Sequence, residues 1–252
     1  ETENGLSPAR ARKDVRNAVS AARKASAWSS ATTHLRAQIL YFLAEKLSVR
    51  AAEFANRLVE LRGAWPNEAA AEVEQAVSRL FSYAAWADKF DGAVHTPPLR
   101  AAVLAMNEPL GVVGVVCPDE RPLLSLVSLM APVIAMGNRA VLVPSQAAPL
   151  LATDFYQVLE TSDVPAGVVN IVTGRRLALA SCLAEHDEVD ALWCFGCAAT
   201  AKKVEELSAG NLKRTFVDHG RFIDWMNCDL AEGRVFLRQA TQVKNIWVPY
   251  GD

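Results

Sequence analysis

Between Ser7 and Phe90 the apolar residues recur at intervals of three and four positions, which is the spacing of amphipathic helices. The apolar faces of three predicted helices are marked by Leu35, Ile39, Leu40, Leu43 and Leu47, by Phe54, Leu58 and Leu61, and by Val73, Val77, Leu80, Phe81, Ala84 and Ala85. Gly63 is placed to end the second helix as a C-cap, and Pro66 to begin the third. We therefore expect residues 1–98 to form an N-terminal helical layer.

After the Pro97–Pro98 pair the pattern changes to short apolar runs that alternate with helical stretches. The runs predicted as strands are Val112–Cys117, Ala140–Val143, Val168–Val172, Ala191–Phe195 and Arg214–Asp218. The helices predicted between them are Leu123–Met136, Pro149–Glu160, Leu177–Glu185 and Ala198–Ser208. Nearly continuous apolar strands separated by single helices are typical of a parallel sheet covered on both faces. The expected fold class is α/β, with a Rossmann-like doubly wound parallel sheet over residues 99–220.

Two apolar segments have no helix that would return them to this sheet. They are Leu99–Met106, the flap strand that precedes the core (99–108), and Gln239–Pro249, which lies in a C-terminal region of linker and strand (221–252). We expect the two to pair antiparallel as a protruding β-flap. A flap of this kind leaves an apolar edge that requires a partner. The candidate interface residues on this edge are Val243, Ile246, Trp247 and Val248.

The composition excludes several classes of function. The 26 basic and 28 acidic side chains leave a formal net charge of −2, which gives no electrostatic case for binding nucleic acid. The longest apolar run, around 123–136, contains Pro132 and is too short to span a membrane. The first residues lack the apolar core of a secretory signal, and five cysteines suit a reducing, cytoplasmic location better than a disulfide framework.

Reactive side chains occur at two predicted strand ends. Cys194 and Cys197 form a C-x-x-C pair between a strand and a helix, where a thiol pKa is lowered, so one hypothesis is a redox module. The alternative, which we prefer, is that both are small residues packed beside a turn. Asp218 and His219 have the chemistry of an acid–base pair, but neighbours on a strand point to opposite faces. With one further cysteine in this region, Cys228, the pattern predicts no metal site.

Five segments, taken in order, resemble the aldehyde dehydrogenase superfamily. They read YAAWADK (83–89), NEPLGVVGVVCP (107–118), APVIAMGN (131–138), PAGVVNIVTG (165–174) and NLKR (211–214). More narrowly, the chain resembles the C-terminal half of family 16 aldehyde dehydrogenases, which looks like a dehydrogenase stripped of its catalytic domain. The resemblance implies an oxidoreductase superfamily, a Rossmann-like NAD-binding fold and a flap strand that adds to the catalytic-domain sheet of a partner subunit.

The departures from the family pattern include its catalytic positions. Family members read P-W-N-F-P after the first Rossmann strand, and the Asn donates to the developing oxyanion. This chain has Glu120 at that position, and a carboxylate there would repel an oxyanion. The general-base Glu of the L-E-L-G-G motif corresponds to Asp218, which is one methylene shorter. Both residues are interpreted as vestigial, so we expect no catalytic residue in this chain.

The cofactor positions depart in the same way. The family's ribose-binding Lys is replaced by Val143, and the Glu that shares this role is replaced by Gln146. One glycine of the fingerprint remains as Gly196, and the second is Ala201. The resemblance therefore implies a vestigial cofactor site at these four positions. We expect no cofactor, or at most weak binding of NAD(P).

The family's catalytic domain of roughly two hundred residues should follow Gly220. Only about thirty residues remain there, and no G-Q-x-C motif with the nucleophilic Cys occurs. We therefore expect a pseudoenzyme domain, not an enzyme by itself, that acts as a structural and oligomerisation scaffold. Its expected partner, docked through the flap strand, is an aldehyde dehydrogenase half of the same polypeptide or of its homodimer mate. The alternative is a part of an active NAD(P)-dependent aldehyde dehydrogenase whose chemistry lies in the rest of the full-length protein.

Overall fold

The computed structural model describes residues 8–250, with side-chain environments from Ala11 onward. Its larger sheet has five parallel strands in the order β5-β4-β3-β6-β7. In chain order they are β3 (Val112–Val116), β4 (Arg139–Val143), β5 (Val169–Ile171), β6 (Ala191–Cys194) and β7 (Arg214–Val217). The predicted doubly wound α/β fold is confirmed, and each of the five predicted strands is present within one or two residues of its expected bounds.

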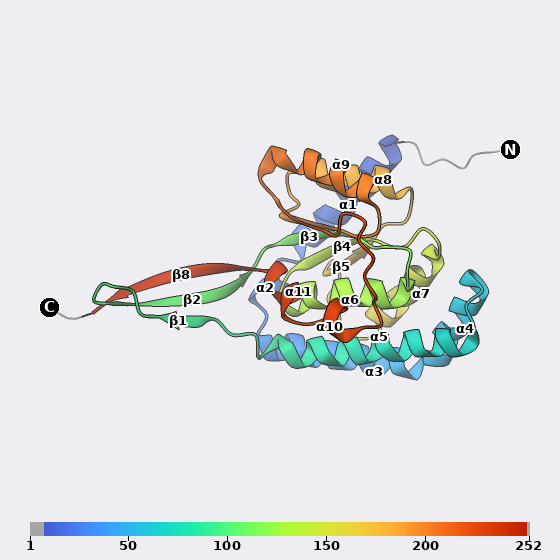
Figure 1. Ribbon diagram of the computed structural model, residues 1–252, viewed down its shortest axis with the longest axis horizontal. Helices are drawn as coiled ribbons and strands as arrows, with labels where there is room; N and C mark the ends of the chain where they lie inside the picture. The colour runs from blue at the N-terminus through green and yellow to red at the C-terminus, as the bar shows by residue number, and fades with distance from the viewer. Residues whose placement is uncertain (1–7, 251–252) are drawn as a thin grey trace.

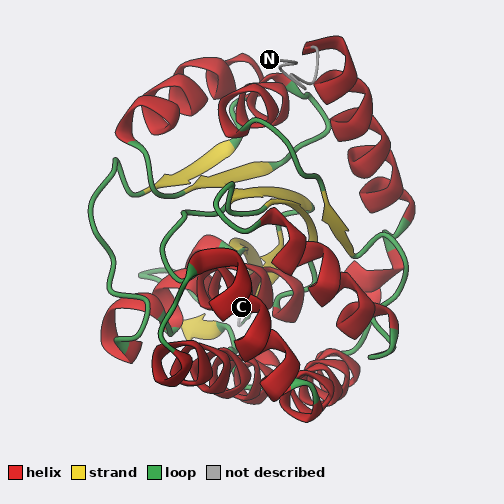
Figure 2. Cartoon of the chain, turned by 90° about the vertical axis from the view of Figure 1, so that its right-hand side faces the viewer, coloured by secondary structure: helices red, strands yellow, loops and turns green. Residues whose placement is uncertain are grey.

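Helices cover both faces of this sheet (Figures 1 and 2). One face carries α1 (Pro8–Lys24), α8 (Arg176–Glu185) and α9 (Ala198–Ser208), which a 3₁₀ turn (Ala209–Asn211) follows. The other face carries α3 (Thr33–Val49), α4 (Ala51–Arg62), α5 (Pro66–Ala87), α6 (Pro122–Ala135) and α7 (Pro149–Glu160), with the short α2 (Ala27–Ser30) leading in. The N-terminal helices are therefore divided between the faces and do not form one layer, because α1 packs against α8 and β4.

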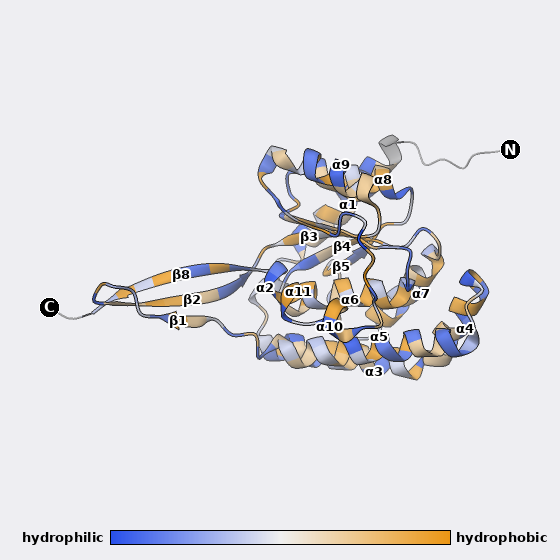
Figure 3. Cartoon of the chain, viewed as in Figure 1, coloured by the Kyte–Doolittle hydropathy of each residue, from blue (hydrophilic) through white to orange (hydrophobic). Residues whose placement is uncertain are grey.

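The central helix α6 shows why the sequence folds in this way. None of its side chains is charged and every residue is buried, because the helix lies between the sheet and α5. Figure 3 shows the same contrast between apolar inner elements and outer helices with both polar and apolar residues.

Gly63 ends α4 at φ +63°, as the C-cap prediction required, and Pro66 begins α5. Trp65, which lies between them, is 73% exposed.

The order of the strands creates a switch point between β3 and β6. The chain runs from β3 outward to β4 and β5, and α8 then returns it to the other side of β3 as β6. In open parallel sheets, ligands bind outside the carboxyl ends of the strands at such a point. The candidate ligand site of this fold is therefore formed by the loops after β3, β4, β6 and β7.

The flap is a three-stranded antiparallel sheet that extends away from the body (Figure 1). Its strands are β1 (Ala93–His95), β2 (Ala101–Pro109) and β8 (Thr241–Pro249), in the order β1-β2-β8. The predicted pairing of β2 with β8 is confirmed, with Leu104 opposite Ile246. The strand β1 was not predicted. After Thr241 every residue of β8 is exposed, and this strand lies at the edge of the flap sheet with β2 as its neighbour.

The segment between β7 and β8 packs across α5 and α6 and contains α10 (Cys228–Ala231) and α11 (Arg234–Gln239). Arg79 of α5 is fully buried and holds this linker in place. Its guanidinium donates to the Trp225 carbonyl oxygen at 3.2 Å and to Ser128 Oγ at 3.0 Å, and its Nε lies 2.8 Å from Glu232 Oε2. Residues 221–240 are therefore a fastened part of the body. None of the described helices is both long enough and apolar enough to cross a membrane.

Candidate functional site

The structure brings most of the predicted site residues to the carboxyl ends of the parallel strands. Glu120 lies in the loop after β3, and Val143 ends β4 shortly before Gln146. Gly196 and Asp218 follow β6 and β7. These four loops surround the switch point between β3 and β6. The predicted interface residues of β8 lie apart from them, on the flap.

Asp119 is the polar centre of this site, and sequence reasoning did not single it out. Its Oδ1 accepts from Ser145 Oγ at 2.7 Å, from the Gln146 amide at 2.9 Å and from Arg176 Nη2 at 2.5 Å. Burial disfavours its ionisation, but the hydrogen bonds from Ser145 and Arg176 outweigh burial and lower the pKa of this carboxyl. Asp119 therefore joins the loop after β3, the loop after β4 and the start of α8.

The turn after β6 retains the geometry that requires glycine. Gly196 has φ +108°, and a Cβ atom there would lie 3.1 Å from the Pro118 Cα. The Gly196 amide donates to Asp218 Oδ2 at 2.7 Å, and Asp218 Oδ1 accepts from the Gly220 amide at 3.0 Å. Asp218 is 9% exposed. Its carboxylate thus links two glycine turns and accepts a hydrogen bond from an amide of each.

Two of the positions where the family has cofactor-binding residues, Val143 and Ala201, belong to the hydrophobic core. Val143 and Ala201 are both fully buried, and Val143 lies in the apolar cluster between the sheet and α1 and α8. Gln146 remains at the surface and lines a small cavity of about 270 Å³ between the loop after β4 and α7. Its Nε2 donates to the Gly174 carbonyl oxygen at 3.5 Å. Of the four predicted cofactor positions, only Gly196 and Gln146 therefore offer polar groups near the crevice.

The cysteines near the site differ in environment. Cys197 is the N-cap of α9 and is partly exposed, and hydrogen bonds from Thr200 and Ala199 lower its pKa. Burial raises the pKa of Cys194 and of Cys117 to about 12. The expectation that Cys194 and Cys197 are both buried is therefore wrong for Cys197. All five cysteines are free, and among the described residues no group of three or more His, Cys, Asp or Glu side chains is placed to hold a metal ion.

Glu120 is exposed at the rim of a cavity of about 460 Å³ between α4, α5, α6 and the linker. The next residue, Arg121, has φ +45° and precedes the first turn of α6. No hydrogen bond or ion pair holds the Glu120 side chain in the described structure. A carboxylate thus stands where the resemblance places an oxyanion donor, and it faces solvent.

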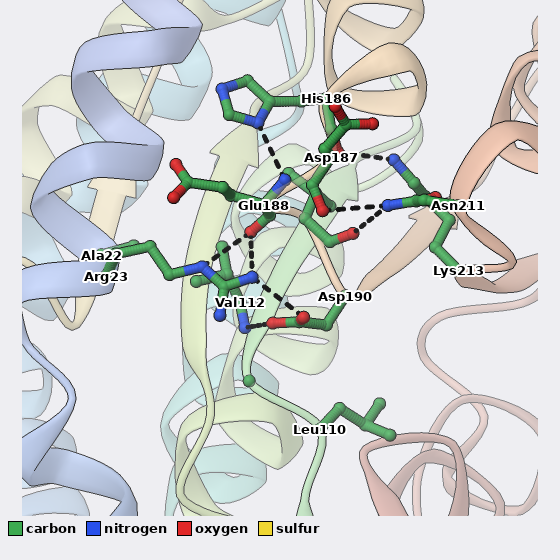
Figure 4. A network of polar contacts seen from close by, with 12 residues as sticks. Ala22, Arg23, Leu110, Val112, His186, Asp187, Glu188, Asp190, Asn211 and Lys213 are labelled. Carbon is green, nitrogen blue, oxygen red and sulfur yellow. Dashed lines mark hydrogen bonds and ion pairs between the residues drawn. The ribbon is translucent and has the colours of Figure 1, made fainter.

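The opposite, amino end of the sheet carries a polar network of a different kind (Figure 4). Arg23 of α1 donates to the Glu188 carbonyl oxygen at 2.9 Å and pairs with Asp190 at 2.9 Å, while Asp190 accepts from the Val112 amide at 2.7 Å. Burial lowers the pKa of Lys213 to about 8. Its ammonium group donates to the carbonyl oxygens of Leu183, Ala184 and His186. These contacts fasten α1 and α8 to the sheet, far from the crevice.

The predicted flap residues are exposed and apolar, as an interface strand requires. The exposed fractions are 60% for Val243, 38% for Ile246, 57% for Trp247 and 44% for Val248. Their strand pairs with β2 along its whole length, and within residues 8–250 no strand pairs with its other edge.

Comparison with known proteins gives a consistent family. A family profile described as "Aldehyde dehydrogenase family" matches residues 2–221. Betaine aldehyde dehydrogenase from Hordeum vulgare is 32% identical over 84% of this chain, and D-glyceraldehyde dehydrogenase (NADP(+)) from Thermoplasma acidophilum is 28% identical over 90% of it. The chain spans 44% and 47% of the lengths of these two relatives.

The similar solved structures are aldehyde dehydrogenases as well. Betaine aldehyde dehydrogenase from Staphylococcus aureus, in complex with NAD+, has a TM-score of 0.78 and 26% identity, covering 82% of this chain and 42% of that protein. An NAD-dependent aldehyde dehydrogenase from Sinorhizobium meliloti has a TM-score of 0.78 and 27% identity over the same shares of the two chains.

These relatives correct one expectation. We expected that this chain is not an enzyme by itself, but the proteins it matches at about 30% identity are named dehydrogenases. The departures at Glu120, Val143 and Ala201 lie within the matched segment and do not remove the likeness.

The order of the motifs, the doubly wound sheet with its flap and the extent of the matched segment all lead to one assignment. The match covers residues 2–221, and the strand that completes the flap follows it at Thr241–Pro249. The chain belongs to the aldehyde dehydrogenase family.

Proposed function

We propose that this chain is the Rossmann-fold part of an NAD(P)-dependent aldehyde dehydrogenase, and that within this enzyme it acts as a structural and oligomerisation scaffold. The partner is the catalytic part of the same polypeptide or of its homodimer mate. The observation that carries the proposal is the β8 strand, whose free edge and exposed apolar side chains extend away from the body of the chain. Oxidation of an aldehyde by the whole protein is also part of this proposal, because the chain spans less than half of the length of its relatives.

The free edge of β8 supports docking by strand addition. An edge strand presents a row of backbone donors and acceptors, and proteins usually shield such edges with charges, prolines or bulges. Between Thr241 and Pro249 the one charged residue is Lys244, which pairs with Glu108 of β2 at 3.1 Å. Ile246, Trp247 and Val248 follow it without a charge. A strand of this composition is suited to extending the sheet of a partner.

The proposal leaves the covalent step to the catalytic part of the enzyme. Oxidation of an aldehyde through a thiohemiacetal needs a reactive thiolate beside an oxyanion donor. Burial raises the pKa of Cys117 and Cys194. Hydrogen bonds from Thr200 and Ala199 lower the pKa of the partly exposed Cys197, which directly follows Gly196 and its bond to the Asp218 carboxylate. A partner domain that carries the nucleophile would complete the reaction. Five free thiols suit a reducing compartment, so a cytoplasmic location is part of this proposal.

The interface is tested by a charge placed on the flap. Ile246→Lys introduces a cation at the apolar edge, and sedimentation velocity on the protein as the cell makes it should show a smaller species at equal concentration. Leu177→Lys on α8, where the leucine is 54% exposed, is the matched control and should leave the sedimentation coefficient unchanged. An unchanged distribution for Ile246→Lys would remove the flap from the interface.

We infer that NAD(P) binding by this part of the protein is weak. The Gly196 amide is already bonded to Asp218, and Val143 is a buried apolar residue that offers no hydrogen-bonding group to a ribose. Isothermal titration with NAD and with NADP tests this inference, and the expected result is no saturation below millimolar ligand. A tight single-site isotherm would instead make Gly196 and the start of α9 a working pyrophosphate site.

A further inference from the structure

A cavity of about 500 Å³ lies where the base of the flap meets the body, and the proposed function leaves it unused. Its walls come from α2, the start of α3, the end of α5, the end of β2 and the start of β8. In Figure 1 the flap leaves the body beside α2. The cavity therefore lies apart from the loops that surround the switch point.

Arg36 brings a buried positive charge to this cavity. The residue is 8% exposed and lines the wall, and it donates to the Ala135 carbonyl oxygen at 2.9 Å and to the Ala31 carbonyl oxygen at 2.8 Å. Within residues 8–250 its guanidinium forms no ion pair, and its Nη2 donates no hydrogen bond. A buried charge without a counter-ion is costly. The carboxylate in the lining, Glu108, is paired with Lys244 at 3.1 Å.

A second buried guanidinium stands behind the same wall. Arg139 is 5% exposed and donates to the hydroxyl of Ser29, which lines the cavity. Asp190 acts on the charge of Arg139 from a distance, but it is itself paired with Arg23 at 2.9 Å. This side of the cavity thus carries an excess of positive charge, which an anion in the cavity would compensate.

The first turn of α3 adds backbone donors beside Arg36. Side chains of a helix point toward its N-terminus, so Arg36 extends back over this turn, where its bond to Ala31 holds it. Thr32 caps the helix, but the amides of Thr33 and His34 have no hydrogen-bond partner among the described residues. Thr32 and Thr33 both line the cavity. Free amides at the start of a helix favour a phosphate or another anion.

The arrangement of these donors indicates the kind of anion. A guanidinium, backbone amides and the Thr33 hydroxyl offer hydrogen bonds from different directions. A phosphoryl group has three oxygens to accept them, whereas a carboxylate has two in one plane. We propose that the cavity at the base of the flap binds a small phosphate monoester, with Arg36 and the first turn of α3 as the contacts of its phosphoryl group. Because the body and the flap both line the cavity, the ligand would bridge them.

Glycerol 3-phosphate and glycerol test the requirement for a phosphoryl group. Isothermal titration of the 252-residue chain at constant ionic strength should give a one-site isotherm with glycerol 3-phosphate and no binding of glycerol. Equal binding of the two compounds would overturn the proposal, because the phosphoryl group would then contribute nothing. Tighter binding of sodium acetate than of glycerol 3-phosphate would also overturn it, because the site would then be one for carboxylates.

Charge substitutions locate the binding to this cavity. Thr33→Glu places a carboxylate at the exposed first position of α3, where a negative charge favours the helix, and should weaken the binding of glycerol 3-phosphate by at least about tenfold. Asn67→Glu adds the same charge to the exposed first turn of α5, outside the cavity, and should bind as the unmodified chain does. Arg36→Gln removes the buried charge and should weaken binding by about tenfold.

Unchanged affinity in Thr33→Glu would refute the site, and this variant remains a test if Arg36→Gln disturbs folding. Equal losses in Thr33→Glu and Asn67→Glu would refute it as well, because the total charge of the chain would then explain the effect.

Hydrogen exchange gives an independent readout of the position of the ligand. Glycerol 3-phosphate should slow amide exchange in residues 32–36, at the start of α3. Protection confined to residues 196–200 would instead place the anion at the turn after β6 and overturn the proposal. The test is independent of the proposed function, because it requires neither the contact of the flap with a partner nor the oxidation of an aldehyde.

Discussion

Gly196 shows at the residue scale how one backbone conformation positions the site. Its φ of +108° and the 3.1 Å approach to the Pro118 Cα exclude a side chain at the switch point. We expect Gly196→Ala to lower the free energy of unfolding by about 1–3 kcal/mol. Urea denaturation measures this change. Gly210→Ala is the control, because a Cβ there meets nothing within 4 Å, and it should change stability by less than about 1 kcal/mol.

Glu72 makes a second prediction at this scale, which concerns pH. Burial raises the pKa of this carboxyl above its ordinary value of 4.5. The folded state therefore binds this proton more tightly than the unfolded state. The resulting stabilisation is fully present below pH 4.5 and is lost as the pH rises through the folded-state pKa.

Glu72→Gln keeps an acceptor for the Leu123 and Leu124 amides but cannot ionise. Relative to the unmodified chain, this variant should therefore gain stability as the pH rises from 4.5 to neutrality. Urea unfolding at several pH values, with the exposed Glu60→Gln as control, measures the difference. A difference that is constant with pH, or that shrinks as the pH rises, would contradict the raised pKa of Glu72.

The residues of the candidate site were only partly predictable from the sequence. Glu120, Gly196 and Asp218 could be placed at strand ends because runs of apolar residues mark where buried strands stop. Asp119 and Glu72 were missed, since their roles depend on Arg176, Ser145 and the α6 amides, which lie 26 to 57 residues away. Contacts at that separation leave no local pattern in a sequence.

At the scale of elements, Arg79 is the residue on which the linker depends. It is fully buried in α5 and contacts Trp225, Ser128 and Glu232. Removing one partner of a buried ion pair leaves the other uncompensated, so we expect Arg79→Leu to cost about 3–5 kcal/mol. The rate of amide hydrogen exchange should rise first in residues 221–240. Arg57→Leu, which breaks the partly exposed contacts with Glu60 and Asp154, should cost less than about 1 kcal/mol.

Retained stability in Arg79→Leu would mean that apolar packing alone holds the linker. Phe236 and Leu237 of α11 are the residues that would do so, because both are buried against the main core. The exchange experiment separates these cases, since it reports the linker apart from the sheet.

Elements with a clear apolar period were predicted well, and those without one were not. The helices α7 and α9 have the predicted bounds, because their buried residues repeat at helical spacing over three turns. The strand β1 has three residues, all exposed, so no alternation could reveal it. The placement of α1 on the α8 face was also beyond the sequence, because an amphipathic pattern shows that a helix has a buried side and not which surface covers it.

At the scale of the whole molecule, the flap and the linker differ in what they contribute to folding. Beyond Gln242 the residues of β8 are exposed and pair only with β2, so they bury little apolar surface. The linker contributes Trp225, Ala231, Phe236 and Leu237 to the main core. Apolar burial provides most of the stabilisation of a domain, so the two segments should respond differently to removal.

A chain shortened to residues 1–242 should therefore keep a cooperative thermal transition close to that of residues 1–252. It retains Thr241, whose carbonyl oxygen accepts from Arg214, and Ala240, whose carbonyl oxygen accepts from Asn138. A chain shortened to residues 1–227 loses α10 and α11 and uncovers the face of α6, so it should unfold or aggregate. Circular dichroism during heating compares the two. If removing the β8 residues after Gln242 also abolished the transition, this strand would be needed for folding itself; if it did not, the exposed strand would be free to serve association, which is the role proposed for it.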